Sequence, residues 1–487
     1  MLNPLSVENA RTLRAFFEQT GYNETTLRKH LGAAELPSAH LRNRARLLDR
    51  TSAPTPLNTL LRWFWLGLPQ ERDSAAQHIP AAELALMLQA GLLAADDGML
   101  APRAMLLHFD GFLVASDHPT AIEARQAEMV LWPNPTSKFL ARFAVKRRSR
   151  ATLDLGTGSG ILSLGAAAYS DTVVATDLNQ RAVACAQFNA RLNAVENVEV
   201  LAGDCFAPVQ GRTFDLILSN PPFFITPQAD YLFCDNPMEL DSLCRRLVKE
   251  GPAYLNEGGY MQMLCEWAQI KDQPWEERVA EWLIDTGCDA WVMKGVTQDP
   301  EEYAQHRIRE TSTDTSGDNA RYAEYMGYYR HRGVEAIHSG VLVMRRRSGQ
   351  NFVRIEEVPP TPTGNLGEMI LSTFAAHDLL RENSTDENLL LLAPRLADHA
   401  RLEQICRPVN GQWQAEKLNL RLTTGFAFHV ALQPLVADFL VAFDGTRTVA
   451  AAIQQFAAKA GAPIAKVQPE CLSMVRKLVE RGFLVGV

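Results

Sequence analysis

The sequence predicts an α/β protein with a largely parallel sheet in the middle of the chain and a small helical domain before and after it. Short apolar runs alternate with helical stretches between residues 121 and 358, which is typical of a parallel sheet covered by helices. A glycine-rich turn follows the first of these runs, as expected where such a sheet binds a ligand. At 487 residues the chain is long enough for several domains, and we expect three: residues 1–120, 121–358 and 365–487.

Both flanking domains are predicted to be winged-helix-like. In the first, apolar residues recur at helical spacing over residues 57–66, a helix is expected over residues 81–91, and Asp97-Gly98 predicts a hairpin turn. A proline-rich linker at residues 358–364 precedes the second. There a helix over residues 471–481 leads into a short apolar strand. Helices therefore precede a short strand or hairpin in both flanks.

Seven apolar runs of the central region are candidate strands. They lie at residues 152–155, 172–176, 198–201, 214–219, 259–264, 290–294 and 340–347. Helices are expected between them at residues 161–169, 180–193 and 239–255. The last two runs are separated by 45 mostly polar residues, which is too long for an ordinary hairpin loop. We expect either an insertion beside the substrate entrance or a disordered segment there.

Composition narrows the function. The formal net charge is -8, so no overall field attracts nucleic acid, although a local basic face would be enough. The basic excesses at residues 42–50 and 146–150 are interpreted as a solvated helix face and a charged helix end. Eight cysteines without a C-x-x-C pair predict no disulfide scaffold and no metal site. Without a signal-like start or a long apolar window, a cytoplasmic enzyme with no membrane segment is expected.

The glycine-rich turn reads Asp154-Leu155-Gly156-Thr157-Gly158-Ser159-Gly160. Glycine at positions 156 and 158 allows a tight turn and a close approach to a ligand. A dinucleotide-binding loop would carry glycine at position 161, where this chain has isoleucine, and a Gly-Lys-Ser/Thr phosphate loop is absent. We therefore expect a ligand that lacks a pyrophosphate group.

Two carboxylates follow the next two predicted strands. Asp177 ends the second strand, where a carboxylate can accept both hydroxyl groups of a ribose. Asp204 ends the third strand, where it can meet an adenine amino group while Phe206 lines the ring. Each aspartate alone is typical of an exposed loop. At these paired positions they indicate a ribose and an adenine without phosphate, a description that S-adenosylmethionine meets.

A stiff polar turn, Asn220-Pro221-Pro222-Phe223, follows the fourth predicted strand. Ligands bind at the carboxyl ends of strands in open α/β sheets. The Asn220 side-chain oxygen and the Pro221 carbonyl can accept the two N–H bonds of a planar amino or amide group. Both acceptors would orient that nitrogen and stabilise the positive charge that develops on it during attack. Phe223 can stack on a flat substrate.

These two motifs together resemble the class I S-adenosylmethionine-dependent methyltransferases, and among them the subset that methylates exocyclic amino or amide nitrogens. The resemblance covers about residues 121–350 and implies a Rossmann-like sheet of seven strands. It implies that Asn220, Pro221 and Phe223 bind the target nitrogen. Residues 131–137 resemble the segment that closes over the methionine end of the cofactor, with Thr136 as the contact. The other implied cofactor contacts are Asp154, Gly156, Thr157, Gly158, Asp177, Leu178, Asp204, Cys205 and Asn220.

The substrate class is indicated less directly. Glutamine-modifying relatives usually carry tyrosine as the fourth motif residue, whereas Phe223 resembles the ribosomal-RNA guanine enzymes, which often continue with histidine where this chain has Phe224. We expect an N-methyltransferase that binds nucleic acid and acts on RNA, or less readily on DNA. The alternatives are methylation of a protein or peptide glutamine amide, and a non-catalytic S-adenosylmethionine-binding protein. The intact Asn220 motif argues against the last.

Overall fold

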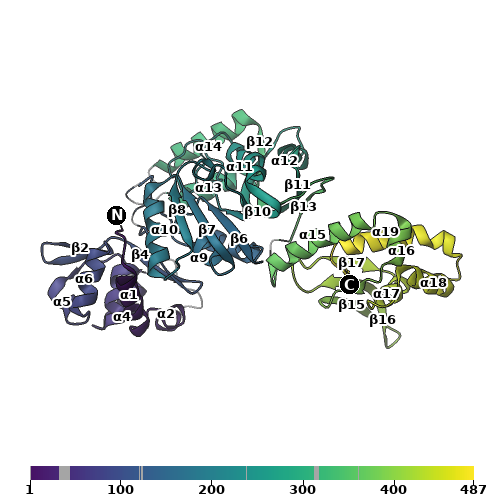
Figure 1. The fold of residues 1–487 in the computed structure, drawn as a ribbon, viewed down its shortest axis with the longest axis horizontal. Helices are drawn as coiled ribbons and strands as arrows, with labels where there is room; N and C mark the ends of the chain where they lie inside the picture. Colours follow the sequence, from purple (N-terminus) through teal and green to yellow (C-terminus); the bar gives the residue numbers. More distant parts are fainter. Residues whose placement is uncertain are drawn as a thin grey trace. The chain divides into compact units, whose positions relative to one another are not determined.

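A computed structural model describes residues 2–31, 44–119, 121, 124, 126–236, 238–311, 317–359 and 361–486. The chain divides into two compact units. The first comprises Met1–Ala141 and Arg147–Glu356, and the second comprises Arg142–Lys146 and Glu357–Val487. Figure 1 shows the chain from its N-terminal helices through the central sheet to the C-terminal helices.

The first unit begins with helices that precede a β-hairpin. The elements are α1 (Val7–Gln19), α2 (Glu24–Leu31), α3 (Arg44–Arg50), α4 (Pro56–Phe64), β1 (Gln70–Glu71), α5 (Arg72–Ala76), α6 (Ala81–Gln89), β2 (Leu93–Asp96) and β3 (Met99–Pro102). Asp97 and Gly98 join β2 to β3 with φ values of 43° and 74°. Two consecutive positive φ values match a type I′ turn, which favours Asp-Gly. The predicted hairpin is confirmed.

A second hairpin joins this region to the central sheet. Strands β4 (Met105–Phe109) and β5 (Phe112–Ser116) turn at Asp110-Gly111, the same dipeptide signal, which the sequence analysis missed. Side chains of helix α10 (Gln180–Leu192) and of its C-cap residue Asn193 hydrogen-bond to the backbone of β5. Asn189 Oδ1 accepts from Ala115 N at 2.8 Å and Asn193 Oδ1 accepts from Leu113 N at 2.9 Å. These buried bonds explain why the N-terminal helices and the central sheet form one unit.

The central sheet has the strand order β13-β11-β12-β10-β9-β6-β7-β8. Its strands are β6 (Ser149–Leu155), β7 (Ser170–Asp177), β8 (Val198–Ala202), β9 (Phe214–Ser219), β10 (Leu255–Ile270), β11 (Cys288–Gln298), β12 (Val334–Arg346) and β13 (Val353–Glu357). All seven predicted strands are present, and β13 adds an eighth at the edge. Strands β6 to β10 pair in parallel, while β12 is antiparallel to β10 and β11. Chain order reverses between β6 and β9, where parallel sheets bind ligands.

Helices cover the sheet where the chain crosses between strands (Figure 1). They are α9 (Ile161–Ala166), α10, α11 (Ser242–Glu250) and α12 (Trp275–Leu283). Helix α8 (Pro135–Phe143) precedes β6, and the 3-10 turn Gly251–Tyr254 precedes β10. Helices α9, α10 and α11 were predicted with shifted ends, and α12 was not predicted.

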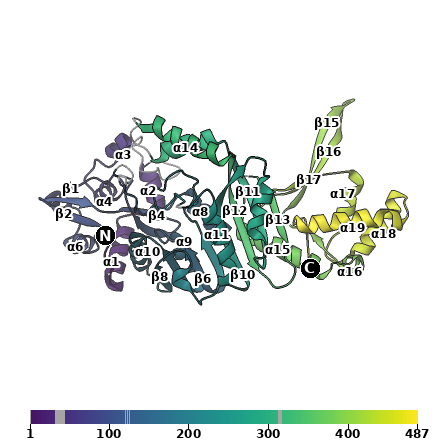
Figure 2. The same cartoon turned by 90° about the horizontal axis from the view of Figure 1, so that it is seen from above.

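The long segment between β11 and β12 contains two helices, α13 (Pro300–Thr311) and α14 (Asp318–Arg332), which pack on each other and on β12. Figure 2 shows α14 from a second direction. Their buried tyrosines form a core cluster with Ile225, which lies shortly after the Asn220 motif. Of the two alternatives for this segment, an insertion fits the described residues.

The second unit is mostly helical around its own apolar core. It contains α15 (Leu366–Glu382), α16 (Asp386–Leu391), β14 (Arg395–Leu396), β15 (Ala400–Val409), β16 (Gln412–Leu422), β17 (His429–Leu432), α17 (Pro434–Val441), α18 (Val449–Ala460), α19 (Ile464–Glu480) and β18 (Leu484–Val485). Helix α19 starts seven residues before the predicted position, and β18 follows it as expected. The three-stranded antiparallel sheet β15-β16-β17 was not predicted.

Candidate functional site

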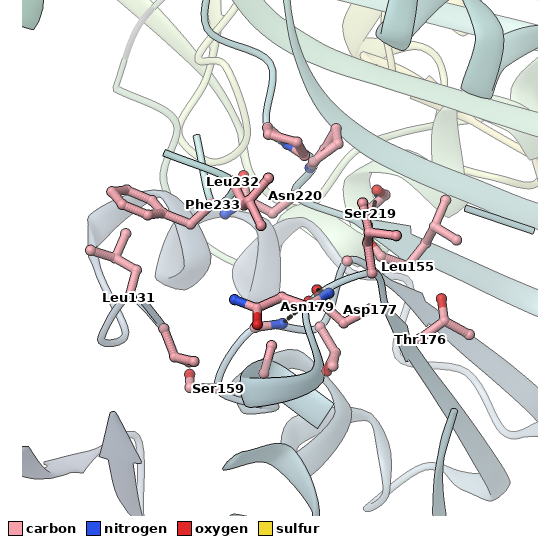
Figure 3. Close-up of a pocket in the computed structure, with 18 of the residues that line it drawn as sticks. Leu131, Leu155, Ser159, Thr176, Asp177, Asn179, Ser219, Asn220, Leu232 and Phe233 are labelled. Carbon is pink, nitrogen blue, oxygen red and sulfur yellow. Dashed lines mark hydrogen bonds between the residues drawn. The ribbon is translucent and has the colours of Figure 1, made fainter. Parts of the chain in front are cut away.

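A cavity opens at the carboxyl ends of β6, β7, β8 and β9, on both sides of the point where strand order reverses. The glycine turn, Asp177, Asp204 and Asn220 all line it. Figure 3 shows Leu155, Thr176 and Ser219 on one side and Leu131, Leu232 and Phe233 on the other. The predicted cofactor and substrate motifs, which lie about sixty residues apart in sequence, are therefore brought to one cavity.

The glycine turn depends on backbone conformations that other residues rarely adopt. Gly156, Gly158 and Gly160 have φ values of 77°, 55° and 84°. A Cβ at Gly160 would also lie 3.1 Å from the Cβ of Ala186 on α10, so this glycine permits close helix packing. The turn is further held by Thr176, whose carbonyl accepts from the N–H groups of residues 156 and 157 at 2.9 Å.

Asp154 holds the turn from beneath. Its Oδ2 accepts from Thr157 Oγ1 at 2.7 Å, from Ser163 N at 3.0 Å and from Ser163 Oγ at 2.5 Å. The side chain is fully buried, and burial raises the pKa of this carboxyl from its ordinary value despite those bonds. Asp154 does not line the cavity, whereas Thr157 does. Asp154 therefore contributes to ligand binding indirectly, by fixing the conformation of the loop.

Asp177 faces the cavity and also fixes the turn. Its Oδ2 accepts from Gly158 N at 2.8 Å and its Oδ1 accepts from Asn179 N at 2.9 Å. Burial raises the pKa of this carboxyl, and the backbone N–H bonds oppose the rise. Each carboxylate oxygen can accept a second bond, so a ribose diol fits here. The neighbouring Leu178 is 60% exposed on the cavity rim.

Asp204 and Cys205 line the next part of the cavity wall. The Cys205 thiol donates to Asp204 Oδ1 at 3.1 Å, and Arg246 pairs with Asp204 Oδ2 at 3.0 Å. The bond from Cys205 and then the Arg246 pair lower the pKa of the Asp204 carboxyl. Phe206, expected to line an adenine ring, instead points inward. It is 1% exposed, stacks on Tyr254 at 4.5 Å and does not line the cavity, so that expectation was wrong.

The Asn220 motif starts where β9 ends, and Asn220, Pro221 and Pro222 line the cavity. Asn220 Nδ2 donates to Thr136 Oγ1 at 3.4 Å. Thr136 Oγ1 in turn donates to Asn134 Oδ1 at 2.6 Å. With its nitrogen directed at Thr136, the Asn220 amide leaves its oxygen as an acceptor for another group.

Two predicted contacts take other positions. Thr136 touches Asn220 and does not line the cavity, although the neighbouring Asn134 and Ser137 do. Phe223 is 9% exposed, packs edge-on against Phe224 at 5.0 Å between ring centroids, and does not line the cavity. A stacking role for Phe223 would require it to turn outward.

A wall of the cavity that the sequence analysis did not anticipate comes from the segment after the motif. Leu232, Phe233 and Asp235 line it. Asp235 is 4% exposed and accepts from Tyr231 N at 2.9 Å, and burial raises the pKa of its carboxyl. The apolar run Tyr231-Leu232-Phe233, about ten positions after the proline pair, was the available signal.

Several arginines of the two basic segments, residues 42–50 and 146–150, have partners within the first unit. Arg147 donates to the Gly258 carbonyl and lies over the Tyr260 ring at 5.0 Å. Arg148 pairs with Asp171 at 2.8 Å, and Arg150 lies 3.6 Å from Asp215. Arg50 donates to the His30 carbonyl at 3.3 Å, whereas Arg42 lies outside the described residues. Among the residues described, no group of three metal-ligand side chains and no helix long and apolar enough to cross a membrane occurs.

Comparison with known proteins agrees with this geometry. The family described as Methyltransferase small domain matches residues 133–278. Two domains of unknown function, DUF7059 and DUF7782, match residues 19–104 and 372–486.

Three curated relatives carry methyltransferase names. The ribosomal RNA small subunit methyltransferase C of Alcanivorax borkumensis is 28% identical over 146 residues, which are 30% of this chain and 39% of the relative. The ribosomal protein uL3 glutamine methyltransferase of Xylella fastidiosa is 30% identical over 139 residues, 26% of this chain and 44% of the relative. The release factor glutamine methyltransferase of Yersinia pestis is 31% identical over 194 residues, 37% of this chain and 68% of the relative.

The alignments thus span from 39% to 68% of the length of these three relatives. The family match at residues 133–278 covers most of the residues that line the cavity. The glycine turn, the acidic side chains and the absence of lysine or arginine from the described lining fit a cation without phosphate groups. The chain belongs to the class I S-adenosylmethionine-dependent methyltransferases, and S-adenosylmethionine is the cofactor that this cavity fits.

Proposed function

We propose that this protein transfers a methyl group to a planar amide or amino nitrogen. The observation that carries the proposal is the placement of Asn220 in the same cavity as the glycine turn, with its side-chain nitrogen held by Thr136. Its oxygen is then an acceptor for one N–H of a target group, and the Pro221 carbonyl is the candidate acceptor for the other. Such a pair of acceptors orients the nitrogen and favours positive charge on it.

Bound S-adenosylmethionine supplies an electrophilic methyl group on a sulfonium. The backbone turn at Gly156 to Gly158 would cradle it, Asp177 would accept its ribose hydroxyls, and Asp204 with Cys205 would face its base. In the transfer the N–CH3 bond forms as the S–CH3 bond breaks, and the nitrogen then releases one proton to solvent. Because the two acceptors stabilise the cationic nitrogen, no strong base is required. Asp235 is occupied by Arg307, at 3.5 Å, and is not assigned that role.

We favour a protein or peptide amide as the substrate. No lysine or arginine belongs to the described lining of the cavity. Binding of a polynucleotide rests on cations that contact phosphates. Of the three relatives named above, the one that the chain covers most, at 68%, is named for a glutamine substrate. These points support the reading that the sequence analysis ranked second.

An RNA base remains the second candidate. Phenylalanine at position 223 and the 28% identity to a relative named for ribosomal RNA favour it. Both candidates offer a planar NH2 group to the same acceptors, so the chemistry of transfer is shared.

The two candidate substrates are distinguished by which class of macromolecule receives a radioactive methyl group. The purified chain is incubated with methyl-tritiated S-adenosylmethionine and lysate from cells that lack it, and RNA, DNA and protein are then separated. Label in protein, recovered as N5-methylglutamine after hydrolysis, supports the amide proposal. Label in RNA alone overturns the amide assignment. Label in no fraction, with wild-type protein that binds the cofactor, overturns the proposed activity.

A further inference from the structure

The backbone just after the Asn220 motif is held at both of its polar groups. Ile225, five residues beyond Asn220, donates its N–H to the Tyr303 hydroxyl oxygen at 3.1 Å. Its carbonyl accepts from the Tyr329 hydroxyl at 2.8 Å. Ile225 is 0% exposed and each tyrosine is 1% exposed, so water does not replace these partners in the folded chain. Tyr303 belongs to α13 and Tyr329 to α14.

The same helices hold the wall segment, which we define as residues 223–236. Arg307 of α13 places its guanidinium 3.6 Å from the centroid of the Phe224 ring and 3.5 Å from Asp235 Oδ1. It also donates to Cys234 Sγ at 3.3 Å. Arg307 is 3% exposed, and a buried guanidinium with such partners is fixed in place. Since Asp235 lines the cavity, Arg307 positions a cavity residue from behind.

Further hydrogen bonds connect these contacts to the central sheet. Tyr303 donates its hydroxyl proton to Glu266 Oε2 at 2.6 Å, and Glu266 Oε1 accepts from Ser339 Oγ at 3.0 Å. Glu266 lies on β10 and Ser339 is its register partner on β12. A continuous chain of hydrogen bonds therefore runs from two sheet strands through Tyr303 to Ile225, two residues after the motif.

We propose that the α13–α14 pair positions the Asn220 motif for methyl transfer, with Tyr303 and Tyr329 as positioning residues that act through the backbone of Ile225. This inference rests on the proposed function of Asn220. It explains why β11 and β12, which could be joined by a short hairpin, are joined by two helices whose buried polar groups point at the wall segment. An unpaired buried backbone group is unfavourable, so loss of either hydroxyl favours a shift of the segment.

The test uses the full chain and three tyrosine-to-phenylalanine changes. Y303F and Y329F remove one bond each to Ile225, and the double variant removes both. Y325F is the matched control, because Tyr325 is also buried on α14 and packs against Tyr329, while no described residue bonds its hydroxyl. Amide hydrogen exchange of peptides spanning residues 221–236 reports the wall segment directly. Calorimetry gives the dissociation constant for S-adenosylmethionine, and transfer of tritiated methyl groups to the lysate fraction labelled by wild type gives turnover.

In the double variant we expect exchange in the wall segment to speed up at least about tenfold. Turnover at saturating cofactor should fall about tenfold to a hundredfold, because small displacements of positioning groups are costly. The dissociation constant for the cofactor should change less than about twofold, a split that a general loss of structure would not produce. Y325F should match wild type in all three measurements.

The proposal is overturned if exchange and turnover in the double variant equal those of Y325F, or if cofactor affinity falls in parallel with turnover. Should the double variant not fold, Y329F carries the same test, since it removes only the bond to the Ile225 carbonyl. If wild type transfers no methyl group to any fraction, the proposed function fails. Exchange in residues 221–236 then still decides whether the tyrosines hold this segment.

Discussion

The two halves of the cavity are built by different means. The cofactor half, formed around β6, β7 and β8, is held by short-range bonds: Asp154 to Thr157 and Ser163, and Asp177 to Gly158. The substrate half, around Asn220 and the wall segment, is held by residues up to about a hundred positions away, such as Tyr303 and Tyr329. Local motifs therefore specify the first half, whereas a distant insertion specifies the second.

This difference predicts that the two halves can be damaged separately. The largest effect is expected from Asn220→Ala, which removes the acceptor for the target nitrogen. Turnover should fall about 10²–10³-fold, as when one preorganised polar group is lost from an active site. Cofactor affinity, measured by calorimetry, should stay within about threefold of wild type. A parallel loss of cofactor binding would mean that Asn220 belongs to the cofactor half.

Asp177→Ala should show the reverse. Both the proposed ribose acceptor and the partner of Gly158 N are lost, so the dissociation constant for S-adenosylmethionine should rise about tenfold to a hundredfold. Turnover at saturating cofactor should change much less. Asp204→Ala is the comparison variant, because Asp204 is half exposed and already paired with Arg246, and its effect on affinity should be smaller. Unchanged affinity in Asp177→Ala would contradict the ribose contact.

The stability of the fold should depend on pH through Glu266, which supports the substrate half of the cavity by its bond to Tyr303. Burial raises the pKa of Glu266 to about 7. Hydrogen bonds from Tyr303 and Ser339 and the charge of Arg307 oppose this rise, and the charge of Glu310 adds to it. Between pH 5 and pH 8 the unfolded chain has already ionised this group, whereas the folded chain must release its proton. Ionisation of Glu266 should therefore lower wild-type stability over this range, on the order of 2–3 kcal/mol.

Glu266→Gln removes that titration while retaining an acceptor for Tyr303. Relative to wild type, the variant should gain stability from pH 5 to pH 8 in urea unfolding followed by circular dichroism. Glu257→Gln is the control, since Glu257 is exposed. A difference between Glu266→Gln and wild type that stays constant with pH would show that Glu266 does not titrate in this range.

The smallest effect is expected at Thr136. Thr136→Val removes the long 3.4 Å bond that directs the Asn220 amide, so turnover should fall only about twofold to fivefold. Thr136→Ser retains the hydroxyl and should be close to wild type. An equal loss of cofactor affinity in Thr136→Val would instead support the contact with the methionine end that the sequence analysis expected.

Much of the cofactor half could be predicted from the sequence because its signals are local. Positive φ at Gly156 and Gly158 needs glycine, and a carboxylate at the end of the second strand is placed by strand length alone. Phe206 was placed wrongly because a side chain in the loop after a strand can turn either way, and here Tyr254 offers an aromatic face inside the fold. The sequence has no local sign of that choice.

The sequence by itself determined the parallel sheet, the glycine turn, the two carboxylates and the Asn-Pro-Pro turn, because periodicity and backbone restriction act within a few residues. Only the tertiary structure decided what surrounds the turn. It placed α13 and α14 behind the wall segment, directed Thr136 toward Asn220 and turned Phe223 against Phe224. Those contacts join residues far apart in the chain, and their geometry follows from how buried polar groups find partners once the sheet has formed.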